Sequence, residues 1–62
     1  MLTDEQVNKV LIDCAKSFGT HYVIPNDKQL IDWTITLLCS GDPAIIKRCE
    51  ELIKNLQTAN PE

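Results

Sequence analysis

The stretch "LIDWTITLLCSGDP", residues 30–43, decides the fold, because it reads as a helix that is apolar around most of its circumference and stops at Gly41. A helix that borders a core on one side normally carries a single apolar stripe. On a wheel of 3.6 residues per turn this one carries two stripes about 150° apart: Leu30, Trp33 and Leu37 form the first, and Ile31, Ile35, Leu38 and Cys39 form the second. Two stripes predict a helix that lies between two neighbours, at the centre of an all-helical domain.

The preceding part of the chain predicts a first helix over residues 4–18. Thr3, followed three residues later by Gln6, is the pattern of a capping box. Gly19 is a natural stop, because glycine takes the left-handed conformation without strain. Ile12 lies off the apolar stripe. The positions of that stripe follow helical spacing: Val7, Val10, Leu11, Cys14, Ala15 and Phe18.

Two further helices are predicted over residues 27–40 and 43–57. Asn26 is the expected cap of the central helix, and Asp42 the cap of the third, with Pro43 at its first position. The third helix has one apolar stripe, made of Ile45, Cys49, Leu52, Ile53 and Leu56, with Ile46 beside it. We therefore expect an all-α three-helix bundle, with residues 1–58 as one helical domain and 59–62 as a frayed tail.

The connection "THYVIP", residues 20–25, is rich in residues that favour an extended backbone. We expect Tyr22 and Ile24 to tuck under the bundle as a lid. The alternative is a short strand that pairs with another chain. His21 is the one histidine of the sequence, and we expect a solvated side chain.

Size and charge bound the possible functions. Sixty-two residues allow one domain, and a domain of this size has little stability to spare. A net charge of −3 argues against a nucleic-acid partner. The sequence carries no secretory signal pattern, no membrane-length apolar run and no lipidation motif, so we expect a cytoplasmic protein without a membrane partner.

The three cysteines, Cys14, Cys39 and Cys49, are widely spaced and all fall on apolar helix positions. We expect buried free thiols that act as small hydrophobic side chains. A zinc site that combines them with His21 is the sharper alternative, but structural zinc normally takes ligands paired two to four residues apart, which this sequence lacks. A disulfide or a redox thiol is the third possibility.

The sequence shows no pattern that carries catalytic chemistry. Neither a nucleophile with a base, nor a glycine-rich phosphate loop, nor a metalloprotease motif is present. The adjacent carboxylates Asp4–Glu5 and Glu50–Glu51 diverge on a helix and are solvated faces. We therefore expect no enzyme activity, no cofactor, no metal and no small-molecule substrate.

The apolar residues exceed what three short helices can cover. Exposed isoleucines in such number indicate an interface. We expect it to be centred on Ile31 and Ile35, with Trp33 near its rim, and to include Leu38, Ile12 and Ile46. The expected function is a small non-enzymatic protein-binding module whose interface takes a copy of itself or a different protein. It would be a regulator, an adaptor, or an accessory protein of a phage or mobile element.

The alternative is a helix-turn-helix regulator that binds nucleic acid. Residues 27–57 resemble the outline of that motif, with Gly41 in the turn and Lys47 and Arg48 directed at the major groove. Several positions depart from the motif, because it requires a small residue where Leu37 stands and apolar residues at Asp42, Lys47 and Glu50. Salt-dependent retention on nonspecific DNA separates the two functions.

Overall fold

A computed structural model describes residues 2–59 and confirms the all-α three-helix fold. Within this range the elements are α1 (Asp4–Ser17), the short 3₁₀ turn η1 (Thr20–Tyr22), α2 (Asp27–Ser40) and α3 (Pro43–Ala59). The third helix continues two residues beyond its predicted end at residue 57. The rest of the predicted tail, residues 60–62, lies outside the described residues.

The helix starts are capped as the sequence predicts. The Thr3 hydroxyl accepts from the Gln6 N–H at 3.1 Å, and the Gln6 side chain accepts from the Thr3 N–H at 2.9 Å, which completes the capping box. Asn26 Oδ1 accepts from the Gln29 N–H at 3.1 Å. Asp42 Oδ1 accepts from the first free N–H groups of α3, at 3.0 and 3.2 Å. Each of these bonds satisfies a donor that the helix itself leaves free.

Glycine ends both α1 and α2. Gly19 and Gly41 have φ of +74° and +79°, the left-handed region that other residues adopt only with strain. At the end of α2 the Gly41 N–H donates to Leu38 O and the Asp42 N–H donates to Leu37 O. These two bonds form a Schellman motif, which satisfies the last carbonyls of α2 and turns the chain directly into α3.

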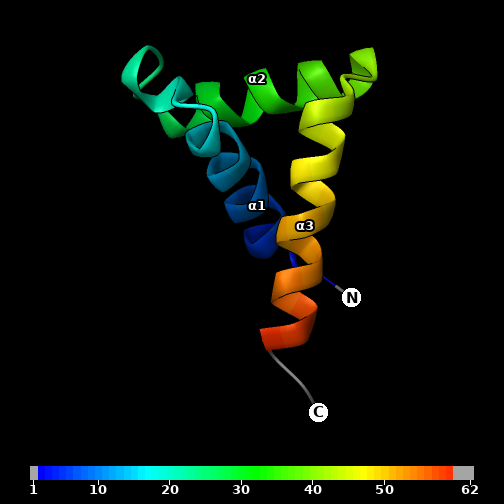
Figure 1. The fold of residues 1–62 in the computed structure, drawn as a ribbon. Helices are drawn as coiled ribbons and strands as arrows, with labels where there is room; N and C mark the ends of the chain where they lie inside the picture. The colour runs from blue at the N-terminus through cyan, green and yellow to red at the C-terminus, as the bar shows by residue number, and fades with distance from the viewer. Residues whose placement is uncertain (1, 60–62) are drawn as a thin grey trace.

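The structure differs from the prediction in the identity of the central helix. Figure 1 shows α1 and α3 running in opposite directions, with α2 lying across one end of the pair. The helix that contacts both neighbours extensively is α1, whereas α2 and α3 contact each other least. The prediction that residues 27–40 form the central helix is therefore wrong, although the three-helix bundle itself is confirmed.

The reason lies in how α2 presents its apolar residues. Leu30 and Thr34 are completely buried, so the buried face of α2 is centred between the two predicted stripes. Leu37 from one stripe and Leu38 from the other both pack against the same core. The two stripes are thus one broad face whose outer margin remains uncovered, instead of two faces that contact different helices.

The core lies where the three helices meet. Its buried cluster consists of Val10 and Cys14 from α1 with Ile45 and Cys49 from α3. The half-buried side chains packed against this cluster are Trp33, Leu37, Leu38, Leu52, Ile53 and Leu56. Large apolar side chains therefore surround a centre that contains two cysteines.

The connection from α1 to α2 overturns the predicted lid. Residues 20–22 form a 3₁₀ turn closed by bonds from the Tyr22 N–H to Gly19 O at 3.1 Å and from the Ile24 N–H to Thr20 O at 2.7 Å. This turn leaves Tyr22 and Val23 more than four-fifths exposed, while Ile24 is half-buried. The local hydrogen bonds curl the segment back on itself, so it cannot extend beneath the bundle.

His21 is not the fully solvated side chain that we expected. It is half-buried, and its Nδ1 atom is shielded from solvent without a hydrogen-bond partner. Its ring lies 4.0 Å from that of Tyr22, centroid to centroid. The turn therefore covers part of its polar histidine and exposes its apolar neighbours.

Candidate protein-binding surface

The uncovered margin of α2 is the first candidate surface. We call Ile31, Ile35 and Cys39 the α2 ridge, because residues four apart lie on one side of a helix. Ile31 is half-buried, Ile35 is 43% exposed and Cys39 is exposed. The exposure follows the helical wheel, since each step of four residues rotates the side chain about 40° further from the buried face.

The prediction that all three thiols are buried in the core is wrong for Cys39, which is exposed. Cys14 and Cys49 are buried as expected, and all three cysteines are free. The position of Cys39 on the second apolar stripe suggested burial, but that stripe ends outside the contact with α1 and α3. An exposed free thiol therefore lies on the same ridge as Ile35.

The remaining residues of the predicted interface are divided between core and surface. Trp33 and Leu38 are half-buried and pack against the core cluster. Trp33 lies about 160° around α2 from Ile35, so the two do not share a ridge. Ile12 on α1 and Ile46 on α3 are each half-buried. Of the six predicted residues, the structure brings Ile31 and Ile35 together on one exposed edge.

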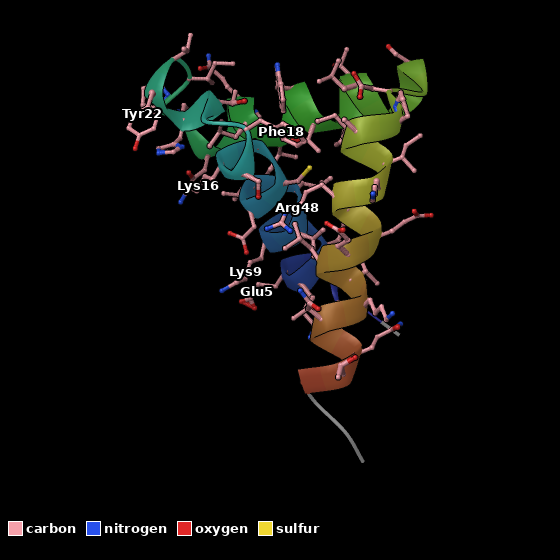
Figure 2. All side chains as sticks on the ribbon, in the orientation of Figure 1. Glu5, Lys9, Lys16, Phe18, Tyr22 and Arg48 are labelled. Carbon is pink, nitrogen blue, oxygen red and sulfur yellow. The ribbon has the colours of Figure 1, made fainter. Side chains whose placement is uncertain are left out.

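A second apolar surface was missed by the sequence analysis. Tyr22 and Val23 are 84% and 82% exposed, more than any other large apolar residue described. Figure 2 shows Tyr22 at the outer end of the molecule, beyond the end of α1 and far from Arg48. The signal available in the sequence was the Gly19–Thr20 pair after a helix end, which favours a tight turn over an extended segment.

Arg48 is bonded within the chain. Its Nε donates to Ser17 Oγ at 2.9 Å, which links α3 to the end of α1, and its guanidinium pairs with Glu51 at 3.3 Å. Ser17 Oγ donates in turn to Asp13 O at 2.9 Å. This arrangement directs one of the two cations of the helix-turn-helix interpretation toward α1 and places a carboxylate against it, which disfavours phosphate binding there.

A shallow groove runs between α1 and α3. It has a volume of about 260 Å³, with an apolar floor of Val10, Leu52 and Leu56 and with Lys9, Asp13 and Asn55 at its edges. Small-molecule sites usually enclose about 300–1,000 Å³. The groove is smaller than that, and the polar residues that line it lie at its edges, so it does not indicate a particular ligand.

The buried thiols are not arranged as a nucleophile. Burial, followed by the influence of the neighbouring Cys49 thiol, raises the pKa of Cys14 from 9.0 to about 12. Cysteine reacts as the thiolate, so the raised pKa lowers the fraction of Cys14 that is reactive at neutral pH. In the range 2–59, no three His, Cys, Asp or Glu side chains are grouped as metal ligands would be.

None of the helices in residues 2–59 combines the length and apolar character needed to cross a bilayer. Comparison of the chain with protein-family models, with curated proteins and with solved structures found no significant match.

Proposed function

We propose that this protein is a small non-enzymatic protein-binding module that pairs with a second copy of itself through the α2 ridge. The observation that carries the proposal is the exposure of Ile35, a large apolar side chain 43% accessible in the middle of a helix. Half-buried Ile31 precedes it by one turn and exposed Cys39 follows it by one turn, so the apolar surface is continuous along α2.

The small size of the domain gives an uncovered apolar side chain a large energetic weight. Complete burial of an isoleucine side chain contributes about 1.5–3 kcal/mol, so covering the exposed part of Ile35 contributes about 1 kcal/mol per copy. A domain of 62 residues has a total stability of only a few kcal/mol. Covering a ridge of this kind is therefore a substantial fraction of the stability of the molecule.

The spacing of the ridge residues suits two-fold pairing. A two-fold axis is the commonest way to cover a surface with a copy of itself. If the axis passes through Ile35 and the two helices run antiparallel, Ile35 meets its own counterpart and Ile31 faces Cys39 of the other copy. The three residues of the ridge are all uncharged, so this register brings apolar side chains and a thiol together along it.

Light scattering across a concentration series tests the proposal directly. The wild-type protein is expected to approach twice the monomer mass as its concentration rises, whereas Ile35→Lys is expected to stay a monomer with its helicity retained. The substitution is tolerable in the monomer, because the lysine stem can lie along the apolar surface while its ammonium reaches water. Circular dichroism of the same samples checks that the variant folds.

Val23→Lys is the matched control, since it replaces a more exposed apolar residue, 82% accessible, outside α2. It is expected to leave self-association unchanged. If Val23→Lys abolishes pairing and Ile35→Lys does not, the α1–α2 turn is the interface and the proposal for α2 is wrong.

Cys39 supplies a second readout, because it stands on the ridge and is a free thiol. Its reaction with a thiol reagent is expected to slow as the wild-type concentration rises and to stay fast in Ile35→Lys. A monomeric wild-type mass at every concentration, with a constant Cys39 rate, contradicts self-association.

A further inference from the structure

Two thiols from different helices meet at the centre of the molecule. Cys14 of α1 is completely buried and Cys49 of α3 is 7% exposed, and both belong to the same core cluster. The Cys14 sulfur lies 3.9 Å from Ile45 O. In α3 that carbonyl is one turn before Cys49 and is the acceptor for the Cys49 N–H. The Cys14 sulfur therefore lies beside the turn of α3 that ends at Cys49.

The side chains at this point allow the two helices to approach closely. Cys14 and Ala15 are both completely buried on α1, and Cys49, another small residue, is buried on α3 in the same cluster as Cys14. The Cys49 thiol is near enough to Cys14 to contribute to its raised pKa. Disulfide formation requires Cβ atoms about 3.8 Å apart, a separation that small side chains at a helix crossing favour.

We propose that Cys14 and Cys49 are a built-in cross-linking pair that forms an intramolecular disulfide within the native fold when the redox environment becomes oxidising. The bond joins the first helix to the last and closes a loop of about 35 residues. Domains of this size commonly use a disulfide as a supplement to a small core. This inference is independent of self-association through the α2 ridge.

The oxidant is a small-molecule disulfide such as oxidised glutathione. One cysteine thiolate attacks the glutathione disulfide, forms a mixed disulfide and releases one reduced glutathione. The second cysteine then attacks the protein sulfur of that mixed disulfide, forms the Cys14–Cys49 bond and releases the second reduced glutathione. Two thiols lose two protons and two electrons, and one glutathione disulfide gains them.

Burial makes the first step slow in the folded protein, so the experiment approaches equilibrium from the unfolded chain. A Cys39→Ser variant removes the exposed thiol and leaves the buried pair. It is equilibrated with reduced and oxidised glutathione in ratios that span full conversion, once in native buffer and once in concentrated urea. Mass spectrometry of acid-quenched samples gives the fraction that has lost two hydrogen atoms.

The effective concentration of the pair is the ratio of disulfide to dithiol protein at equilibrium, multiplied by the squared concentration of reduced glutathione over that of oxidised glutathione. It is expected to be at least tenfold higher in native buffer than in urea. Linkage requires the disulfide to increase the folding equilibrium constant by the same factor. The chain-entropy relation for such a loop allows an increase of roughly several hundredfold when the bond introduces no strain.

A Cys49→Ser variant, which retains Cys14 and the exposed Cys39, is the matched control. Folding separates that pair, so its effective concentration is expected to fall in native buffer. The proposal is overturned if the Cys14–Cys49 pair gives equal or lower effective concentration in native buffer than in urea. It is also overturned if the oxidised chain loses its helical circular dichroism, because the bond then forms only outside the native fold.

Discussion

Thr34 shows how one residue determines which side of α2 is buried. Its side chain is completely buried, and its hydroxyl lies 2.9 Å from Leu30 O on its own helix and 3.0 Å from Leu11 O on α1. A buried hydroxyl is tolerated only when it is hydrogen-bonded. The bond to Leu30 O stays within α2, whereas the bond to Leu11 O fixes Thr34 at the contact between α2 and α1.

Thr34→Val is expected to reduce the free energy of unfolding by about 1 kcal/mol, the net contribution of a typical hydrogen bond. Both carbonyls keep their own helical N–H partners, so the loss is modest. Urea denaturation measures it. Thr36→Val is the control, because Thr36 makes the same bond within the helix, 2.8 Å to Asp32 O, but is exposed. Equal losses at the two positions would contradict a special role for Thr34.

The raised pKa of Cys14 predicts that the protein loses stability in base. The unfolded chain releases the thiol proton near pH 9, whereas the folded protein retains it until about pH 12. The folded state therefore binds more protons in this window, and stability falls as pH rises through it. Unfolding free energies at pH 8 and 10.5 are expected to differ more in the wild type than in Cys14→Ala. Cys39→Ser should keep the wild-type dependence, and an unchanged dependence in Cys14→Ala would contradict the assignment.

At the scale of elements, Asp42 connects α2 to α3. Its carboxylate caps α3 through bonds to the Ala44 and Ile45 N–H groups, and its own N–H closes α2 by donating to Leu37 O. Asp42→Ala is expected to lower the unfolding free energy by about 1 kcal/mol, the usual effect of losing an N-cap. Asp42→Asn keeps an acceptor at the same place and should lose less than half of that. Thermal and urea unfolding of the two variants measure the difference, and equal losses would rule out the cap.

The elements themselves were predictable because their signals are local. Thr3, Asn26, Asp42 and the two glycines act within four residues of the helix ends, and the predicted bounds agree with the structure to within two residues. The orientation of α2 was not predictable in the same way. Its wheel is apolar over a wide arc, and which part of that arc is buried depends on where α1 and α3 lie.

The candidate site was predictable to a smaller extent for the same reason. Ile35 was identified as an exposed isoleucine, and the structure leaves it exposed. Trp33 and Leu38 were assigned to the same interface but pack on the core, and Cys39 was assigned to the core but is exposed. Tyr22 and Val23 were missed, because their preference for extended backbone gave way to the hydrogen bonds of the turn after Gly19.

At the scale of the whole molecule, burial only slightly outweighs the loss of chain entropy. Self-association should therefore make the stability of the protein depend on its concentration. A domain this small folds with little free energy to spare. If folding and pairing occur together, each chain gains stability in proportion to the logarithm of its concentration. A monomer has no such dependence, so the melting temperature distinguishes the two without knowledge of any partner.

The wild-type melting temperature is therefore expected to rise by about 3–5 °C for each tenfold increase in concentration above the dissociation constant, given the unfolding entropy of a domain of this size. In Ile35→Lys the melting temperature should not change with concentration, because the uncovered lysine is solvated in the monomer. Val23→Lys should retain the wild-type slope. A wild-type melting temperature that stays constant from the micromolar to the submillimolar range would mean that the three helices are stable alone, and that the exposure of Ile35 is simply the margin of a face too broad for its two neighbours to cover.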